Sequence, residues 1–339
     1  MKVESQRIGY LDSLKGIAII LVIIGHIIQY CIFPNNYDDN HIFRYIYSFH
    51  MAFFMALSGF TVKYNFNGWN EVFNSIEKRA VNLLLPFISW ALISYFFLDG
   101  PSIYEILLKP DRGLWFLYAL FWIFTLFIII TRIVGNRNKI IVYSTLLLTC
   151  IALSYLSRHI RIGGVNLIAN HFQNFTFGFI LADNKNLLSR MNLKCLFLFL
   201  PIYLFLGYFW HRNGLEIQEC NNCIYEIVTS IPFKRHLITI SATLSLFIIA
   251  HKMEKQFRLL KLETLGKATL GIYAVHFLLI DLLQILPDEI KSLLFHSPLG
   301  YIVTFCFILS ASYYVIVALN YNKYTALFLL GKSYSLKDR

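Results

Sequence analysis

The first apolar stretch of the chain carries side chains that could move protons. It reads LDSLKGIAIILVIIGHIIQY and places Asp12, Lys15 and His26 among aliphatic residues. Ionisable groups are costly in such surroundings and are functional candidates for that reason. A neutral imidazole can accept a proton near neutral pH, so His26 is a candidate general base. The alternative is that His26 is a packing residue held by a hydrogen bond.

Lys15 lies eleven residues before His26. In an α-helix this spacing puts both side chains on one face, about 16 Å apart along the axis. They would therefore line the same cavity without touching. Lys15 is a candidate for binding an anionic cofactor, with Asp12 beside it as a candidate substrate-binding residue. Alternatively, Lys15 extends to lipid headgroups.

A second histidine, His50, lies in the segment SFHMAFFMALSGF. If this segment is a helix that starts near residue 42, His50 lies about 12 Å from its start, and His26 about 10 Å from the end of its own helix. The two imidazoles would then lie at matching depth and could face one another. This makes His50 a second catalytic candidate, with a structural role as the alternative.

Lys78 and Arg79 introduce the next apolar segment. Fixed positive charge at a helix end suits a ligand that bears phosphates, so both residues are candidates for cofactor binding. Basic residues at the inner ends of membrane helices are also a common topology signal, and that alternative stays open.

Residues that could bind a polar substrate, such as a sugar whose hydroxyl accepts a transferred group, follow in two later segments. Trp115 begins WFLYALF and could stack on a sugar ring, with an interfacial aromatic belt as the alternative. Asn170, His171 and Asn174 put polar groups into an apolar segment, where an acceptor hydroxyl would need partners. Hydrogen bonds between helices are the alternative for these three. We interpret His276 as mainly structural.

The elements that position these residues are predicted to be membrane helices. The chain has 57% hydrophobic and 14% charged residues and a mean hydropathy of +0.59, which fits a soluble domain poorly. Helices are expected because lipid offers no partner to an unpaired backbone group. The net charge of +11 indicates basic loops beside anionic lipid rather than nucleic-acid binding.

Polar, glycine and proline clusters divide the chain into a single all-α membrane domain, 1–339, with ten helices. The predicted ranges are 8–33, 42–62, 80–98, 114–131, 140–157, 164–182, 193–211, 236–251, 266–286 and 299–319. Most of the 30 lysines and arginines fall in segments that are cytoplasmic if the N-terminus is inside. This predicts that both termini are cytoplasmic and that the chemistry lies among the helices.

Of the six cysteines, only Cys220 and Cys223 form a local motif. A zinc site would want a second such pair or a nearby paired histidine, so we expect no metal. We interpret this pair as a local disulfide or as two inert thiols.

Five segments, in this order, resemble acyltransferase family 3, a family of ten-helix membrane enzymes, over nearly the whole chain. They are LDSLKGIAIILVIIGH, FHMAFFMALSGF, KRAVNLLLPFISW, GLWFLYALF and LGKATLGIYAVHF. The chain is most similar to the branch of sugar and polysaccharide O-acetyltransferases. The resemblance implies a bacterial cytoplasmic membrane enzyme with acetyl-CoA or another acyl-CoA as donor, and it implies that His26 is catalytic.

Two positions depart from the pattern of that family. The family has arginine before the histidine of the first helix, where this chain has Lys15. It also has a pair of arginines before the proline of the third helix, where this chain keeps Arg79 but has Asn82. Lysine is a point charge and asparagine is neutral, so both changes remove bidentate phosphate contacts. Donor affinity is the property that they affect.

These observations predict transfer of an acyl group, expected to be acetyl, from acyl-CoA to a hydroxyl of a lipid-linked or surface glycan. A sugar hydroxyl is a weak nucleophile, and His26 would remove its proton during attack. An acyl-histidine intermediate stays open. The alternative is a transporter or flippase for a glycan or lipid precursor, with its intramembrane charges along the path. A third interpretation, an accessory subunit of a polysaccharide synthase, would make His26 dispensable.

Overall fold

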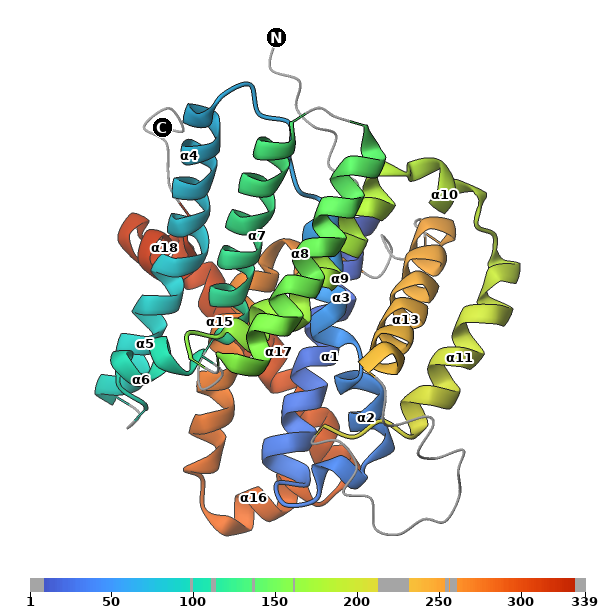
Figure 1. Cartoon of the computed structure of the whole chain (residues 1–339). Helices are drawn as coiled ribbons and strands as arrows, with labels where there is room; N and C mark the ends of the chain where they lie inside the picture. The colour runs from blue at the N-terminus through green and yellow to red at the C-terminus, as the bar shows by residue number, and fades with distance from the viewer. Residues whose placement is uncertain are drawn as a thin grey trace. The chain divides into compact units, whose positions relative to one another are not determined.

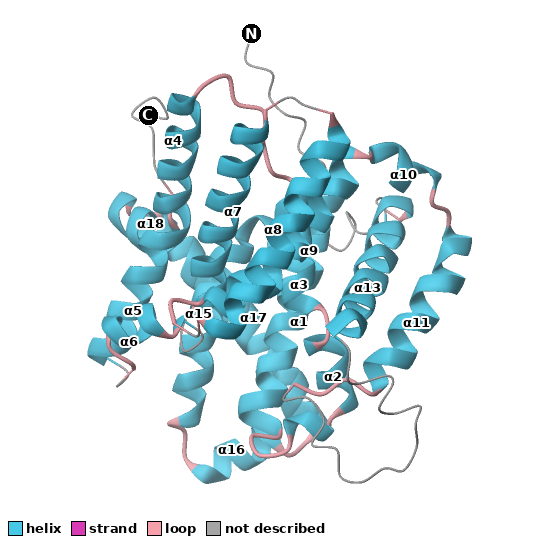
Figure 2. Cartoon of the chain, viewed as in Figure 1, coloured by secondary structure: helices cyan, strands magenta, loops and turns pink. Residues whose placement is uncertain are grey.

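The computed structural model describes residues 9–97, 100–110, 114–135, 138–160, 162–212, 232–253, 256 and 261–332. Every regular element among these residues is a helix (Figures 1 and 2). The predicted all-α class is therefore confirmed for the described chain. Cys220 and Cys223 lie outside the described residues.

Six of the described helical stretches are long and apolar enough to cross a membrane. They are Gly9–Ile32, Trp69–Phe97, Trp115–Val134, Lys139–His159, Leu262–Gln284 and Pro298–Asn320. Large apolar side chains such as Phe197, Leu147 and Phe307 are exposed, as expected of surfaces that face lipid. The chain is a membrane protein. All ten predicted ranges contain helix, but ten membrane spans remain a prediction.

The chain forms two compact units, which are described separately below. The first comprises residues 1–57 and 184–314, and the second comprises 58–183 and 315–339. The helices of the first unit are α1 (Gly9–Ile27), η1 (Ile28–Ile32), η2 (Tyr37–Asp39), α2 (His41–Tyr47), most of α3 (His50–Phe60), α10 (Lys185–Arg190), η5 (Leu193–Cys195), α11 (Leu196–Tyr208), α13 (Pro232–Lys252), α15 (Leu262–Gln284), α16 (Asp288–Phe295) and most of α17 (Pro298–Asn320). The helices of the second unit are the end of α3, α4 (Trp69–Arg79), η3 (Ala80–Leu84), α5 (Leu85–Phe97), α6 (Ile103–Leu108), α7 (Trp115–Val134), α8 (Lys139–His159), α9 (Val165–Asp183), the end of α17 and α18 (Lys323–Leu330).

In the first unit, α1 packs closely against α15 because glycines remove the side chains between them. A Cβ added to Gly266 would lie 1.7 Å from the carbonyl oxygen of Asp12, and one added to Gly16 would lie 2.3 Å from that of Leu262. Small residues at such contacts let membrane helices approach to backbone distance. This packing aligns the two helices that carry His26 and His276.

Replacing Gly266 by valine is expected to force α1 away from α15. Overpacking of this kind typically costs about 1–3 kcal/mol of stability. Thermal unfolding of the purified protein measures the effect. Gly68→Val is the matched control, because nothing lies within 4 Å of a Cβ added there. Equal melting temperatures for the two variants would contradict the close α1–α15 packing.

The second predicted helix, 42–62, is corrected to two helices, α2 and α3. At the junction the Ser48 hydroxyl donates to the carbonyl oxygen of Tyr45 at 2.7 Å. Serine hydroxyls that bond back to the preceding turn compete with the helical hydrogen bonds and often bend helices. The junction lies directly before His50, which begins α3.

The start of the third predicted helix, 80–98, is also corrected. Residues 69–97 form one continuous helical stretch of α4, η3 and α5. The added turns read WNEVFNSIEKR and bury only Val72, so this part is amphipathic and contains no apolar run that would mark it. Lys78 and Arg79 consequently lie within the helical stretch instead of at its start.

The π-helical segment η3 ends at Leu84, two residues before Pro86, which cannot donate a backbone hydrogen bond. A π-helical adjustment in the preceding turn accommodates this loss. In the same unit α18 packs against α5, where the indole Nε1 of Trp90 donates to the carbonyl oxygen of Leu329 at 2.9 Å.

Asp183 fixes α9 against α8 in the second unit. Its carboxylate accepts hydrogen bonds from Tyr143 at 2.6 Å and Tyr64 at 3.0 Å, and it pairs with Lys139 at 2.9 Å. Burial acts to raise the pKa of Asp183, but these donors outweigh it and hold the pKa below its ordinary value. The contacts hold in place the helix that carries Asn170, His171 and Asn174.

Candidate active site

His26 and His276 form a buried pair in the first unit. The His26 Nδ1 lies 2.8 Å from the His276 Nε2, and the rings are nearly parallel at 9° with centroids 5.0 Å apart. Their side chains come from α1 and α15 and are separated by 250 residues in sequence. His26 is 9% exposed and His276 is fully buried. The structure therefore makes His276, for which the sequence predicts a mainly structural role, the direct partner of His26.

The hydrogen bonds of His276 determine which nitrogens carry protons. Its Nδ1 lies 3.1 Å from the carbonyl oxygen of Ile272, and a carbonyl can only accept. The Nδ1 of His276 is thus the protonated nitrogen of a neutral ring, and its Nε2 accepts from the Nδ1–H of His26. This chain leaves the Nε2 of His26 with a free lone pair, which is the form that a general base requires.

His50 has the same tautomer by the same argument. Its Nδ1 lies 2.8 Å from the carbonyl oxygen of Ile46, so that nitrogen donates and Nε2 keeps its lone pair. The Tyr47 ring contacts the imidazoles of both His26 and His50, with centroid distances of 6.0 Å and 4.7 Å. The two predicted catalytic residues are therefore neighbours of one tyrosine, while the direct hydrogen-bond partner of His26 is His276.

Aromatic side chains surround this pair of candidate bases. The Phe277 ring lies 4.3 Å from that of His26, and the Tyr30 ring lies 5.8 Å away. Tyr30 is 41% exposed, and the hydroxyl of Tyr47 donates to Gln29. Flat rings beside a base suit the binding of a sugar ring while excluding water.

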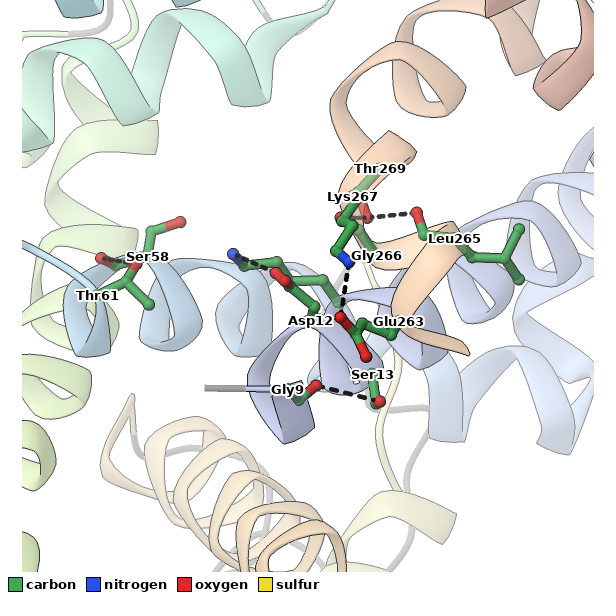
Figure 3. A network of polar contacts seen from close by, with 11 residues as sticks. Gly9, Asp12, Ser13, Ser58, Thr61, Glu263, Leu265, Gly266, Lys267 and Thr269 are labelled. Carbon is green, nitrogen blue, oxygen red and sulfur yellow. Dashed lines mark hydrogen bonds and ion pairs between the residues drawn. The ribbon is translucent and has the colours of Figure 1, made fainter. Parts of the chain in front are cut away.

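Lys15 and Asp12 form an ion pair in the first turns of α1. The Lys15 Nζ lies 3.4 Å from the Asp12 Oδ1, and the side chains are 29% and 3% exposed. Figure 3 shows Asp12 beside Gly266 and the adjacent ion pair of Lys267 with Glu263, whose nitrogen and oxygen are 2.6 Å apart. Asp12 is thus a partner that orients Lys15, and Lys15 keeps part of its surface accessible.

The other predicted cofactor-binding residues belong to the second unit. Arg79 is half-buried and places its guanidinium 4.2 Å from the centre of the Phe124 ring, while Lys78 is exposed. The Asn82 amide, oriented so that its nitrogen donates, lies 2.8 Å from the carbonyl oxygen of Gly331. The asparagine that departs from the family pattern therefore connects η3 to the end of α18.

Two of the predicted acceptor-binding residues are brought together. The rings of Trp115 on α7 and His171 on α9 stack with centroids 5.1 Å apart and an angle of 23°. Asn174 is buried and donates within its own helix to the carbonyl oxygen of Asn170 at 3.1 Å, while Asn170 is exposed. Trp115, His171 and Asn170 therefore form the accessible part of this group.

Within the described part of the chain, no group of three or more His, Cys, Asp or Glu side chains is arranged to hold a metal ion. Cys31, Cys150, Cys195 and Cys306 are free thiols.

Comparison with known proteins shows sequence similarity to one family and to two relatives. A family described as an acyltransferase domain matches residues 8–321. The nodulation protein NolL of Sinorhizobium fredii is 31% identical over 185 residues, covering 51% of this chain and 48% of that protein. NolL of Mesorhizobium japonicum is 25% identical over 309 residues, covering 80% of this chain and 77% of that protein. The match thus spans about half the length of the first relative. No solved structure is significantly similar.

Proposed function

Because the chain belongs to acyltransferase family 3, we propose that it transfers an acetyl group from acetyl-CoA to a hydroxyl of a cell-surface glycan or lipid-linked saccharide. The observation that carries this proposal is the hydrogen-bond chain from Ile272 through His276 to His26. It presents one buried, neutral imidazole with a free Nε2. That group is what an unactivated hydroxyl needs for attack on a thioester.

In the proposed reaction the His26 Nε2 removes the hydroxyl proton as the oxygen attacks the thioester carbonyl. The tetrahedral intermediate collapses, the carbon–sulfur bond breaks, and the CoA thiolate takes the proton back from His26. The His276 partner stabilises the transient imidazolium by accepting from its Nδ1–H. His50 is the second candidate base. Transfer through an acyl-histidine is a variant of this scheme in which the imidazole itself attacks first.

For the donor, we propose that Lys15, Lys78 and Arg79 attract the phosphates of acyl-CoA. Trp115, Asn170, His171 and Asn174 are the proposed acceptor-binding residues of the second unit, and Asp12 acts by orienting Lys15. The protein would lie in the bacterial cytoplasmic membrane with both termini inside and ten spans, since the basic residues are concentrated in the segments that this topology makes cytoplasmic.

The direct test is incubation of purified protein with labelled acetyl-CoA, with and without membrane glycan. We expect CoA release that depends on the glycan, and label in the glycan fraction. The alternative of a transporter or flippase predicts movement of the precursor without any acyl-CoA. Glycan transport without label transfer would therefore replace the proposed function.

Lys15→Gln is expected to raise the KM for acyl-CoA by about tenfold while kcat changes little, which is the signature of lost uniform binding. Because the change also leaves Asp12 without its cation, the double variant Asp12→Asn/Lys15→Gln separates the two effects. Steady-state kinetics with varied acyl-CoA gives both constants. If both variants retain the wild-type KM but lose kcat, Lys15 does not bind the donor.

A further inference from the structure

Arg212, just beyond the end of α11, lies at the edge of the histidine site. Its guanidinium is 5.6 Å from the centre of the Tyr47 ring and 6.0 Å from that of Tyr37. The same Tyr47 ring contacts both His26 and His50. This cation and both candidate bases therefore contact the same aromatic ring.

The position of Arg212 is fixed by its backbone. Its N–H donates to the carboxylate of Asp38 at 3.2 Å. The neighbouring Arg44 has other partners, since it bonds the carbonyl oxygens of Asp38 and Tyr208 and pairs with Asp39 at 3.7 Å. The carboxylate of Asp38 thus accepts from the Arg212 backbone, and that of Asp39 pairs with the Arg44 side chain.

The Arg212 guanidinium is by contrast held on aromatic faces. Among the residues that the structure describes, no carboxylate forms an ion pair with it, and the residue is exposed. A guanidinium that stacks on tyrosines keeps the N–H groups at its edge available for an anionic ligand. Tyr30 is partly exposed and contacts His26, so it adds a further aromatic side chain beside those of Tyr37 and Tyr47.

We propose that Arg212 binds an anionic group of the acceptor, so that the preferred substrate is an acidic saccharide unit. The anion is a carboxylate of the sugar or a phosphate that links the sugar to a lipid. The tyrosine faces hold the sugar ring between Arg212 and His26, which presents a hydroxyl to the base. Forked N–H donors match both carboxylate and phosphate oxygens. This inference rests on the proposed function, because it identifies the substrate class of the same site.

Equilibrium binding to the protein in neutral-lipid nanodiscs tests the assignment without turnover. The probes are an oligosaccharide ending in glucuronic acid, its neutral methyl ester, and a glucose linked to a lipid diphosphate. Arg212→Gln is expected to bind at least one acidic probe about 10- to 100-fold more weakly than the wild type, with ester binding unchanged. The probe that loses affinity identifies the source of the anion. Arg212→Lys should retain part of the affinity.

Lys291→Gln is the matched control, because it removes a positive charge of the first unit that already pairs with Asp288 at 2.7 Å. It should leave the affinity for every probe unchanged. Equal affinity of wild type and Arg212→Gln for both acidic probes would overturn the proposal. So would wild-type protein that binds the ester as tightly as the acid and shows no preference for the diphosphate.

Kinetics then separate this inference from the function on which it rests. With an acidic acceptor, Arg212→Gln should raise the acceptor KM with little change in kcat. An equal fall in kcat with acidic and neutral acceptors would show that Arg212 acts at the reacting centre, against the proposal. Arginine-dependent binding without CoA release from any acceptor would support the anion site and refute acyl transfer.

Discussion

His26→Ala is expected to reduce acyl transfer by about 10²- to 10⁴-fold, the usual contribution of a general base. The variant loses the Nε2 of His26, which the hydrogen bond between His26 and His276 leaves unprotonated beside the Phe277 ring. Binding of both substrates should persist, so the loss should appear in kcat. Rates of CoA release with purified protein and saturating acceptor measure it.

This change also has an effect on stability, because the buried Nε2 of His276 loses its hydrogen-bond donor. An unsatisfied buried acceptor costs about 1–3 kcal/mol, so a modest fall in melting temperature is expected as well. His50→Ala is the comparison, since His50 is buried and bonds the backbone in a similar way. It should impair transfer less. Wild-type turnover by His26→Ala would refute the assignment, and a larger loss in His50→Ala would exchange the two roles.

Much of the fold could be predicted, because membrane helices are recognisable in a sequence as long apolar runs. Each of the ten predicted ranges contains helix in the structure. The errors have local causes. The turns of Trp69–Arg79 contain polar and charged residues between the apolar ones and bury only Val72, so hydropathy gave no sign of them. The break between α2 and α3 lies at Ser48, whose hydroxyl bonds back to Tyr45, and no window average detects such a local contact.

The candidate site was only partly predictable. His26 is conspicuous because it is an ionisable residue in an apolar run, and that argument needs no tertiary structure. His276 lies in an equally apolar helix, but its role depends on a contact with a residue 250 positions away. The signal that existed was Gly16 and Gly266, since small residues on both helices permit the close approach that pairs the two histidines.

The departures from the family pattern also acquire physical meaning from the structure. Asn82 stands where the resembled pattern has an arginine, and its amide donates to the carbonyl oxygen of Gly331. Lys15 is paired with a nearly buried Asp12, so part of its charge is already compensated. Of the cations that we propose to bind the donor, Arg79 stacks on the Phe124 ring, so it is the next one to vary after Lys15.

His276→Leu is expected to lower kcat by about 10²- to 10⁴-fold, because the group that orients the candidate general base is removed. The imidazole of His26 would lose its acceptor, and its Nδ1–H and Nε2–H tautomers would then compete. The KM values for donor and acceptor should change little, because His276 is buried and lies behind the base.

A purely structural role for His276 makes a different prediction, and His276→Gln distinguishes the two. The glutamine Oε1 can accept the Nδ1–H of His26, so this variant should recover a substantial part of kcat, whereas leucine packs well but cannot accept. Nitrogen-15 spectra of labelled His26 provide a readout that packing alone would not change. The wild type should show a protonated Nδ1 and an unprotonated Nε2, and His276→Leu should show a mixture of tautomers. If leucine and glutamine impair kcat equally, in proportion to their loss of melting temperature and with no change in the His26 spectrum, His276 only packs between α1 and its neighbours.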